Sequence, residues 1–493
     1  MEKHYYTNKL VKMGKWPLWP LDCDAWFSHD GSLYFEKSFG IPKGLLMIFT
    51  LDNGYEHAYV PVSYFETLYA RIRAINKEDY KNLEKILKKF YSFKEKTKKA
   101  IVKLHKKDLG ELSSRELSEL YVANRDLAHQ VTIYDQFGWL AEEYWKPLMD
   151  EVIVRKLKIP KDSDEYHRVL FALTVPEEIS TTLEEKRAVL KASIAVKKSP
   201  KVLTKEGEKL AEEFGWMPVF AYGDAWGAEH YSEELSKTVE KEFTVLEKEY
   251  AVLAEYTAVR QKNIDDIVKK YKLDSRDLQH FIDFGLALDG RNEAEYLVSY
   301  IGFYLVPLYH EIIRRLGVTV AELRKLFEKD IVACLAGMAD VRKLLDAKGD
   351  IVGYGYDEEM RSRIEFNSAE ARKLFDHVES VVKSVQGNNE LKGVCASRGK
   401  AIGKARIVPS PADNGKVQEG DILITHATTV DYLPAMKKAA AIITEVGGLT
   451  CHAAVVSREF GIPCVVALKN AMKNFKDGDM VEVDADKGLV RKL

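Results

Sequence analysis

The stretch from Thr444 to Glu459, TEVGGLTCHAAVVSRE, decides the fold of the carboxy-terminal part of this chain. The apolar run from Ala439 to Ile443 precedes it and predicts a buried strand. Gly447 and Gly448 predict a tight turn, because glycine adopts backbone conformations that other residues avoid. The apolar residues after His452 predict a helix that begins at this histidine. The stretch is therefore typical of a strand, a glycine turn and a helix.

His452 is the residue in this pattern with the clearest chemical potential. A helix start offers unpaired backbone N–H groups and the positive end of the helix dipole, and both favour a phosphate. An imidazole at this place can attack phosphorus and hold the phosphoryl group covalently. We therefore predict His452 as the catalytic residue, with Gly447, Gly448 and Thr450 positioning the phosphate. Thr450 is equally typical of a helix N-cap.

The chain from Gly393 to Leu493 also resembles a known family, the phosphohistidine swivelling domain of phosphoenolpyruvate-utilising enzymes. In that family the histidine of a Gly-Gly-x-Thr-x-His-Ala-Ala pattern is the one phosphorylated, and His452 stands at that position. The resemblance implies a compact α/β domain whose phosphohistidine travels between distant sites. Besides the histidine pattern it depends on four further segments in the family's order, which are GVCASRGKAIGKA at 393–405, GDILI at 420–424, GIPCVV at 461–466 and DGDMVEVD at 477–484.

A metal site is the competing interpretation of the same region, with Cys451, His452, His426 and Cys464 as ligands. The side chains of adjacent Cys and His residues diverge, and the region has no Cys-x-x-Cys or His-x-x-x-His spacing. The spacing therefore does not favour this interpretation, and we predict no metal ligand.

The composition of the 493 residues places the chain among globular proteins of two to four domains. Its charge of -2 argues against a nucleic-acid or membrane binder, because neither polyanion would attract it over long range. Five scattered cysteines fit a reducing compartment, and the amino terminus has no signal pattern. We expect a cytoplasmic protein that binds neither nucleic acid nor membrane.

Four segments are predicted along the chain, and together they give a multidomain protein with a mainly α-helical amino-terminal region and a carboxy-terminal α/β swivelling domain. Residues 1–65 are rich in aromatics and predict an irregular α/β segment. Residues 66–387 have helical patterns and predict a domain that binds substrate. Residues 388–393 are polar, end in glycine and predict a linker, with the swivelling domain at 394–493.

Local signals within the helical region predict where particular helices lie. Ser113 to Glu116 and Thr319 to Glu322 both match the capping box that starts a helix. Between Glu233 and Tyr271, apolar residues at alternating spacings of four and three predict one face of a long helix, which we expect to be buried in an antiparallel helix pair. The members of this apolar stripe are Leu235, Val239, Phe243, Leu246, Tyr250 and Leu253.

Two further segments in the helical region are candidates for substrate binding. Tyr222 to His230 joins glycines, titratable groups and Trp226 in an expected loop. Asp289 to Glu293 interrupts a helical pattern and offers Arg291, whose guanidinium suits a phosphate or carboxylate. Simple structural turns explain both segments as well.

The order of domains resembles the later part of rifampicin phosphotransferase, yet an ATP-grasp domain and a phosphate-binding loop are not visible in the sequence. We therefore expect no directly bound cofactor and a separate ATP-grasp partner that supplies ATP and Mg, as in phenylphosphate synthase with its separate histidine subunit. The first hypothesis is a dikinase-type phosphotransferase subunit that carries a phosphoryl group on His452 to a small-molecule acceptor. The alternative is a phosphocarrier or regulatory protein that passes phosphate to a protein partner. The donor, ATP or phosphoenolpyruvate, stays open, although the missing pyruvate barrel favours ATP.

Overall fold

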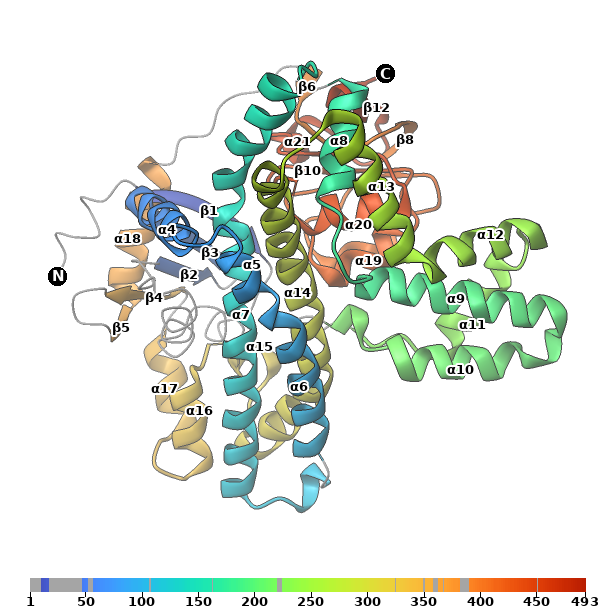
Figure 1. The fold of residues 1–493 in the computed structure, drawn as a ribbon. Helices are drawn as coiled ribbons and strands as arrows, with labels where there is room; N and C mark the ends of the chain where they lie inside the picture. Colours follow the sequence, from blue (N-terminus) through green and yellow to red (C-terminus); the bar gives the residue numbers. More distant parts are fainter. Residues whose placement is uncertain are drawn as a thin grey trace. The chain divides into compact units, whose positions relative to one another are not determined.

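The structure is a computed structural model that describes most of the chain, with its helices and strands shown in Figure 1. The contacts divide the chain into two compact units, which we describe separately. The first unit comprises residues 1–77, 90–136 and 301–388, and the second comprises 78–89, 137–300 and 389–493. The described residues are 10–16, 47–51, 56–105, 108–161, 163–219, 224–323, 325–348, 351–357, 362–366, 368–381, 390–449 and 451–493.

The first unit combines an antiparallel five-stranded sheet with helices. The strand order is β1-β3-β2-β4-β5, so strands from both ends of the unit's sequence share one sheet. The strands are β1 (Leu10–Trp16), β2 (Met47–Leu51), β3 (Glu56–Pro61), β4 (Ile351–Asp357) and β5 (Ser362–Phe366). The helices are α4 (Val62–Ile75), most of α6 (Lys89–Leu104), η1 (Leu109–Glu111), α15 (Val320–Leu323), α16 (Glu328–Leu335), α17 (Val341–Lys348) and α18 (Ser368–Val381).

Two long helices, α7 (Ser114–Asp150) and α14 (Ser275–Leu316), contribute residues to both units. The capping box predicted at the start of α7 is confirmed, because the Ser113 and Glu116 side chains bond each other's backbone N–H. The box predicted from Thr319 to Glu322 is confirmed in the same way at the start of α15. Both helices therefore begin where the local signal predicts.

The helical part of the second unit places α9, α10, α11 and α12 side by side (Figure 1). The single long helix predicted from Glu233 to Tyr271 is wrong, since three helices occupy that range. The Lys197 side chain, which comes from α9, donates to the backbone oxygens of Val239 and Lys241 and satisfies carbonyls where α11 ends. These helices are α5 (Asn82–Leu87), η2 (Glu151–Lys156), α8 (Asp164–Leu173), α9 (Thr181–Lys198), η3 (Pro200–Val202), α10 (Leu203–Phe214), η4 (Met217–Val219), α11 (Ala228–Thr238), α12 (Phe243–Ala254) and α13 (Tyr256–Tyr271).

The carboxy-terminal part of the second unit is an eight-stranded mixed sheet of order β6-β13-β12-β8-β9-β10-β11-β7. Strands β8, β9, β10 and β11 run parallel to their neighbours in this block, and the outer strands pair antiparallel. The strands are β6 (Glu390–Lys392), β7 (Val394–Ser397), β8 (Lys400–Ile407), β9 (Ile422–Thr425), β10 (Ala441–Thr444), β11 (Cys464–Val466), β12 (Met480–Asp484) and β13 (Leu489–Lys492). The helices are η5 (Pro411–Lys416), η6 (Val430–Tyr432), α19 (Leu433–Met436), α20 (His452–Phe460), α21 (Ala471–Asn474) and η7 (Ala485–Lys487).

The predicted fold class, a mainly helical amino-terminal region followed by an α/β domain, is confirmed. Within the described ranges, none of the helices combines the length and apolar character needed to cross a bilayer. Part of the predicted linker is a strand, because Glu390–Lys392 forms β6 and pairs with β13. The Gly393 N–H also bonds the Gly488 carbonyl, so residues 390–393 belong to the carboxy-terminal sheet. The domain boundaries and the hinge role of this segment stay predictions.

Candidate phosphohistidine site

A short turn connects the buried strand β10 to helix α20, and its shape depends on Gly447. Gly447 has φ +113°, a backbone conformation that L side chains rarely adopt. A Cβ atom at this position would lie 2.8 Å from the Cys451 Sγ atom, which is too close. The Cys451 N–H bonds the Gly448 carbonyl at 3.3 Å and closes the turn. The turn therefore requires glycine at position 447. Thr450 lies outside the described residues.

Helix α20 begins at His452, with Cys451 as its N-cap, as the sequence predicts. The Cys451 side chain makes no capping bond, and the first helical hydrogen bond runs from the Val455 N–H to the Cys451 carbonyl. The N–H groups of the first turn therefore have no partner within the helix and can bind an anion beside the imidazole. The α20 backbone thus supports the phosphate chemistry predicted for this position.

The His452 imidazole is buried, with 1% of the residue exposed. Its Nδ1 lies 3.0 Å from the Thr428 Oγ1, and its Nε2 has no hydrogen-bond partner among the described residues. Burial, and after it the Arg291 charge, lower the pKa of His452 to about 3. The ring is therefore neutral near pH 7. When Nδ1 carries the proton and donates it to Thr428, Nε2 holds the lone pair that a nucleophile needs.

Thr428 is a site residue that the sequence analysis missed. It follows β9 at the edge where β9 and β10, which run parallel, both end. Loops at the carboxyl ends of parallel strands converge, and polar residues there often form a site. The pair Thr428-Thr429, which is separated by two residues from the buried strand β9, was the signal that could have identified it.

Arg291 is near enough to His452 for its charge to add, after burial, to the lowered pKa of the imidazole. The expectation that Asp289 to Glu293 interrupts a helix is wrong, because α14 continues through the segment. The polar residues are accommodated by pairing inside the protein. Glu293, for example, accepts hydrogen bonds from the Thr181 N–H at 2.7 Å and the Thr181 hydroxyl at 2.6 Å. The structure thus brings Arg291 to the predicted nucleophile from 161 residues away, counted from 291 to 452.

Trp226 lies in a different environment. Its ring stacks on the His230 ring with the centroids 4.4 Å apart, and the Lys437 Nζ lies 4.8 Å from the indole centroid. Lys437 belongs to the carboxy-terminal domain, so Trp226 contributes to the contact between this domain and helices α9 to α11. The substrate-binding role predicted for Trp226 stays a prediction.

Buried polar contacts hold the carboxy-terminal domain against α9 and α11 within the second unit. Lys437 Nζ lies 2.8 Å from the Glu185 carboxylate and 3.2 Å from the Glu234 carboxylate. Burial raises the pKa of Glu185 to about 7, although the nearby Lys437 opposes this shift. At the N-cap of α9, one turn before Glu185, the Ser180 hydroxyl donates to Glu459 of α20 at 2.5 Å. We call the Lys437, Glu185 and Glu234 cluster the latch.

Comparisons with known proteins find relatives of the carboxy-terminal part of the chain. Residues 417–488 match the family described as PEP-utilising enzyme, mobile domain. A probable phosphoenolpyruvate synthase of Archaeoglobus fulgidus is 54% identical over 112 residues, which is 23% of this chain and 15% of that protein. The phosphoenolpyruvate synthase of Pyrococcus furiosus is 53% identical over 102 residues, 21% of this chain and 12% of that protein. A pyruvate kinase of Lactobacillus delbrueckii subsp. bulgaricus is 45% identical over 105 residues, 21% of this chain and 18% of that protein. The similarity therefore spans less than a fifth of each relative.

Proposed function

We propose that the chain is a phosphotransferase subunit that carries a phosphoryl group on His452, because residues 417–488 match the mobile domain of PEP-utilising enzymes. A nucleotide-binding ATP-grasp partner, with ATP and Mg²⁺, charges the histidine. A small-molecule hydroxyl, bound by the helical part of the second unit, accepts the group. The observation that carries the proposal is the neutral His452 imidazole at the start of α20, with Nδ1 at Thr428 and Nε2 without a hydrogen-bond partner among the described residues.

The residues around His452 support both half-reactions. In the charging step Nε2 attacks the β-phosphorus of the ATP held by the partner, the bond from that phosphorus to the AMP oxygen breaks, and AMP leaves. Hydrolysis then releases the terminal phosphate and leaves one phosphoryl group on Nε2. Thr428 Oγ1 accepts from Nδ1–H and favours the positive ring that forms. In the delivery step the acceptor oxygen attacks phosphorus and its hydroxyl proton passes to water, while the N–P bond breaks and the ring returns to its neutral form. Arg291 lies where its charge can offset the negative phosphoryl oxygens. Transfer through a covalent intermediate divides one displacement into two easier ones.

The burial of His452 supports a domain that moves. With 1% of the residue exposed, a nucleotide has no access to Nε2 in the arrangement described here. We propose that this arrangement is the delivery state, and that the domain leaves the helices to be charged. Because the nucleophile docks against α14 of its own chain, the geometry favours a small-molecule acceptor over the alternative of a phosphocarrier that serves a protein partner.

The test is to label the protein with the candidate ATP-grasp partner and ATP radiolabelled at the β-phosphate, and in parallel with labelled phosphoenolpyruvate. We expect one acid-labile, alkali-stable label per chain, which His452→Gln abolishes. His426→Gln is the matched control, since His426 is the other histidine of the domain and bonds Glu445 at 2.9 Å. Full labelling of a folded His452→Gln protein would contradict the assignment.

A further inference from the structure

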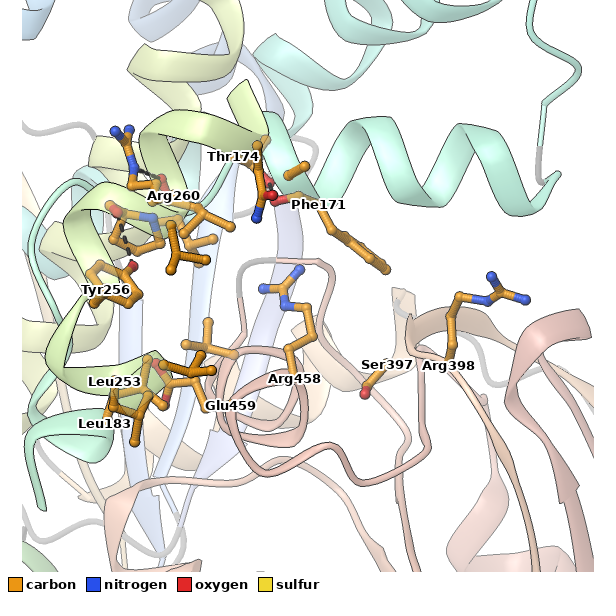
Figure 2. Close-up of a pocket in the computed structure, with 18 residues that line it drawn as sticks. Phe171, Thr174, Leu183, Leu253, Tyr256, Arg260, Ser397, Arg398, Arg458 and Glu459 are labelled. Atoms are coloured by element: carbon orange, nitrogen blue, oxygen red, sulfur yellow. Dashed lines mark hydrogen bonds between the residues drawn. The ribbon is translucent and has the colours of Figure 1, made fainter. Parts of the chain in front are cut away.

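A cavity lies along α20, and His452 does not line it. It has a volume of about 580 Å³, within the range of roughly 300–1,000 Å³ typical of small-molecule sites. Val455, Arg458 and Glu459 of α20 line one side. Helix α13 and the segment after α8 line the other side (Figure 2). The cavity therefore contacts the flank of the helix that carries His452.

The lining is mostly apolar, with aliphatic side chains such as Leu183, Leu253, Leu288 and Val455 and the ring of Phe171. One polar group of the lining, the Tyr256 hydroxyl, already has a hydrogen-bond partner within the protein. The Tyr256 hydroxyl donates to the Pro176 carbonyl at 2.9 Å. A ligand for this cavity therefore needs a large apolar body with few polar groups.

The charged groups of the lining favour an anion. The Arg260 Nε donates to the Val175 carbonyl at 2.9 Å, a neutral acceptor, and no ion pair of Arg260 occurs among the described residues. Arg458 donates to the Leu449 carbonyl and lies 5.2 Å from the Phe171 ring centroid. Arg398 is different, because it bonds Asp164 at 2.6 Å and Asp486 at 3.0 Å.

The negative charge near the cavity is small by comparison. Glu459 is the carboxylate of the lining, and burial raises its pKa to about 7, so part of it is protonated near pH 7. Asp289 lies close enough to Tyr256 to help raise the pKa of that phenol, after the larger effect of burial, but it is not part of the lining. The guanidinium of Arg260 is therefore available to a ligand carboxylate or sulfonate.

We propose that this cavity binds an amphipathic organic anion, which acts as an effector that holds the carboxy-terminal domain in the docked arrangement. One wall belongs to the carboxy-terminal domain and includes Ser397 and Glu459. The other wall belongs to the helices on which this domain docks and includes Phe171 and Leu288. A ligand that touches both walls binds the docked state better than the undocked state. By linkage, the ratio of its affinities for the docked and undocked states is also the factor by which a saturating ligand increases the ratio of docked to undocked protein.

The probe for the test is 8-anilinonaphthalene-1-sulfonate, an apolar body with one anionic group. Its neutral counterpart is N-phenyl-1-naphthylamine, which lacks the sulfonate. Both are titrated by fluorescence into the full chain. We expect the sulfonate to bind about 10-fold more tightly, the value of one charge-assisted hydrogen bond.

Four variants locate the probe. Arg260→Gln should weaken the anionic probe about 10-fold and leave the neutral probe unchanged. Val259→Trp should weaken both probes at least 10-fold, since it fills the cavity from α13; Leu253→Phe replaces it if that variant does not fold. Lys262→Gln is the matched control, because it removes a positive charge from an exposed position of the same helix.

Hydrogen exchange tests the effector role. The anionic probe should increase the protection of the amides of α20 from exchange. Lys437→Met removes the latch cation and so lowers the docked population, and probe binding should weaken by the same factor as that population. Unchanged probe affinity in both cavity-filling variants, or in Arg260→Gln, would overturn the site. Probe binding without added α20 protection would overturn the effector role. None of these measurements depends on phosphotransfer, so their failure is distinct from failure of the proposed function.

Discussion

At the residue scale, the state of His452 depends on one hydroxyl neighbour. Thr428→Val keeps the shape of the side chain but removes the acceptor for Nδ1–H. Losing one buried hydrogen bond costs about 1–2 kcal/mol, so we expect the rate of His452 phosphorylation to fall roughly 5- to 30-fold. Thr428→Ser, which retains the hydroxyl, should recover most of the rate in the same assay. Equal rates for the valine and serine variants would show that Nδ1 does not need this partner.

His452 also makes stability depend on pH. Its pKa is about 3 in the folded protein, against about 6.5 in the unfolded chain. The stability that comes from this depressed pKa is fully present above about pH 6.5 and is lost as the pH falls toward 3. Between pH 7 and 5 the loss is about 2 kcal/mol.

The comparison of wild type with His452→Gln isolates this effect, because all other titrating groups are common to both proteins. We expect the difference in unfolding free energy, from urea titrations, to fall by about 2 kcal/mol between pH 7 and 5. A difference that stays constant with pH would mean that the imidazole is not buried in its neutral form.

At the element scale, the start of α20 depends on the turn before it. Gly447→Ala places a methyl group 2.8 Å from Cys451 Sγ at a φ of +113°, and such strained positions cost about 1–3 kcal/mol. We expect lower stability and slower labelling of His452, because the first turn of α20 must shift.

The control is Gly461, which ends the same helix at φ +72° with no atom within 4 Å of an added Cβ. Gly461→Ala should cost about 1 kcal/mol from backbone strain alone and leave the labelling rate unchanged. If both variants label at the wild-type rate, the geometry of the turn does not matter to the chemistry.

The latch is a second feature of this scale, formed by residues of α9, α11 and the end of α19. Lys437→Met leaves Glu185, itself 1% exposed, without its cation, and breaking a buried pair costs about 3–5 kcal/mol. We expect faster hydrogen exchange in α20 and a lower urea midpoint. Lys437→Met combined with Glu185→Leu should recover much of the loss. Lys400→Met, at an exposed pair with Asp484, should change little, and a similar loss there would remove the special role of the latch.

At the scale of the whole molecule, the proposed transfer requires the carboxy-terminal domain to travel. We propose that the hinge precedes β6, since Glu390–Lys392 pairs with β13 in the domain's own sheet. Deletion of residues 386–388 should therefore slow either charging or delivery by orders of magnitude and leave the other near normal. Single-turnover measurements of the two half-reactions separate these outcomes. Normal rates for both would mean that the histidine does not move on this joint.

The sequence by itself determined the features that depend on neighbours in the chain. The strand, glycine turn and helix around His452, the capping boxes of α7 and α15, and the two-part fold class all follow from local pattern and composition. Each reflects backbone geometry and hydrophobic periodicity, which act over a few residues. The long helix expected from Glu233 to Tyr271 is instead three helices, α11, α12 and α13, and the Lys197 side chain from α9 donates to carbonyls in the break between α11 and α12.

Only the tertiary structure decided the environment of the nucleophile. Thr428 comes from the end of the adjacent parallel strand β9, and Arg291 comes from a helix far away in sequence. The neutral state of His452 depends on burial by these elements, because desolvation lowers the pKa of an imidazole only when distant segments exclude water from it. No local pattern carries that information, since the contacts form between segments that are separated by 24 residues at Thr428 and by 161 at Arg291.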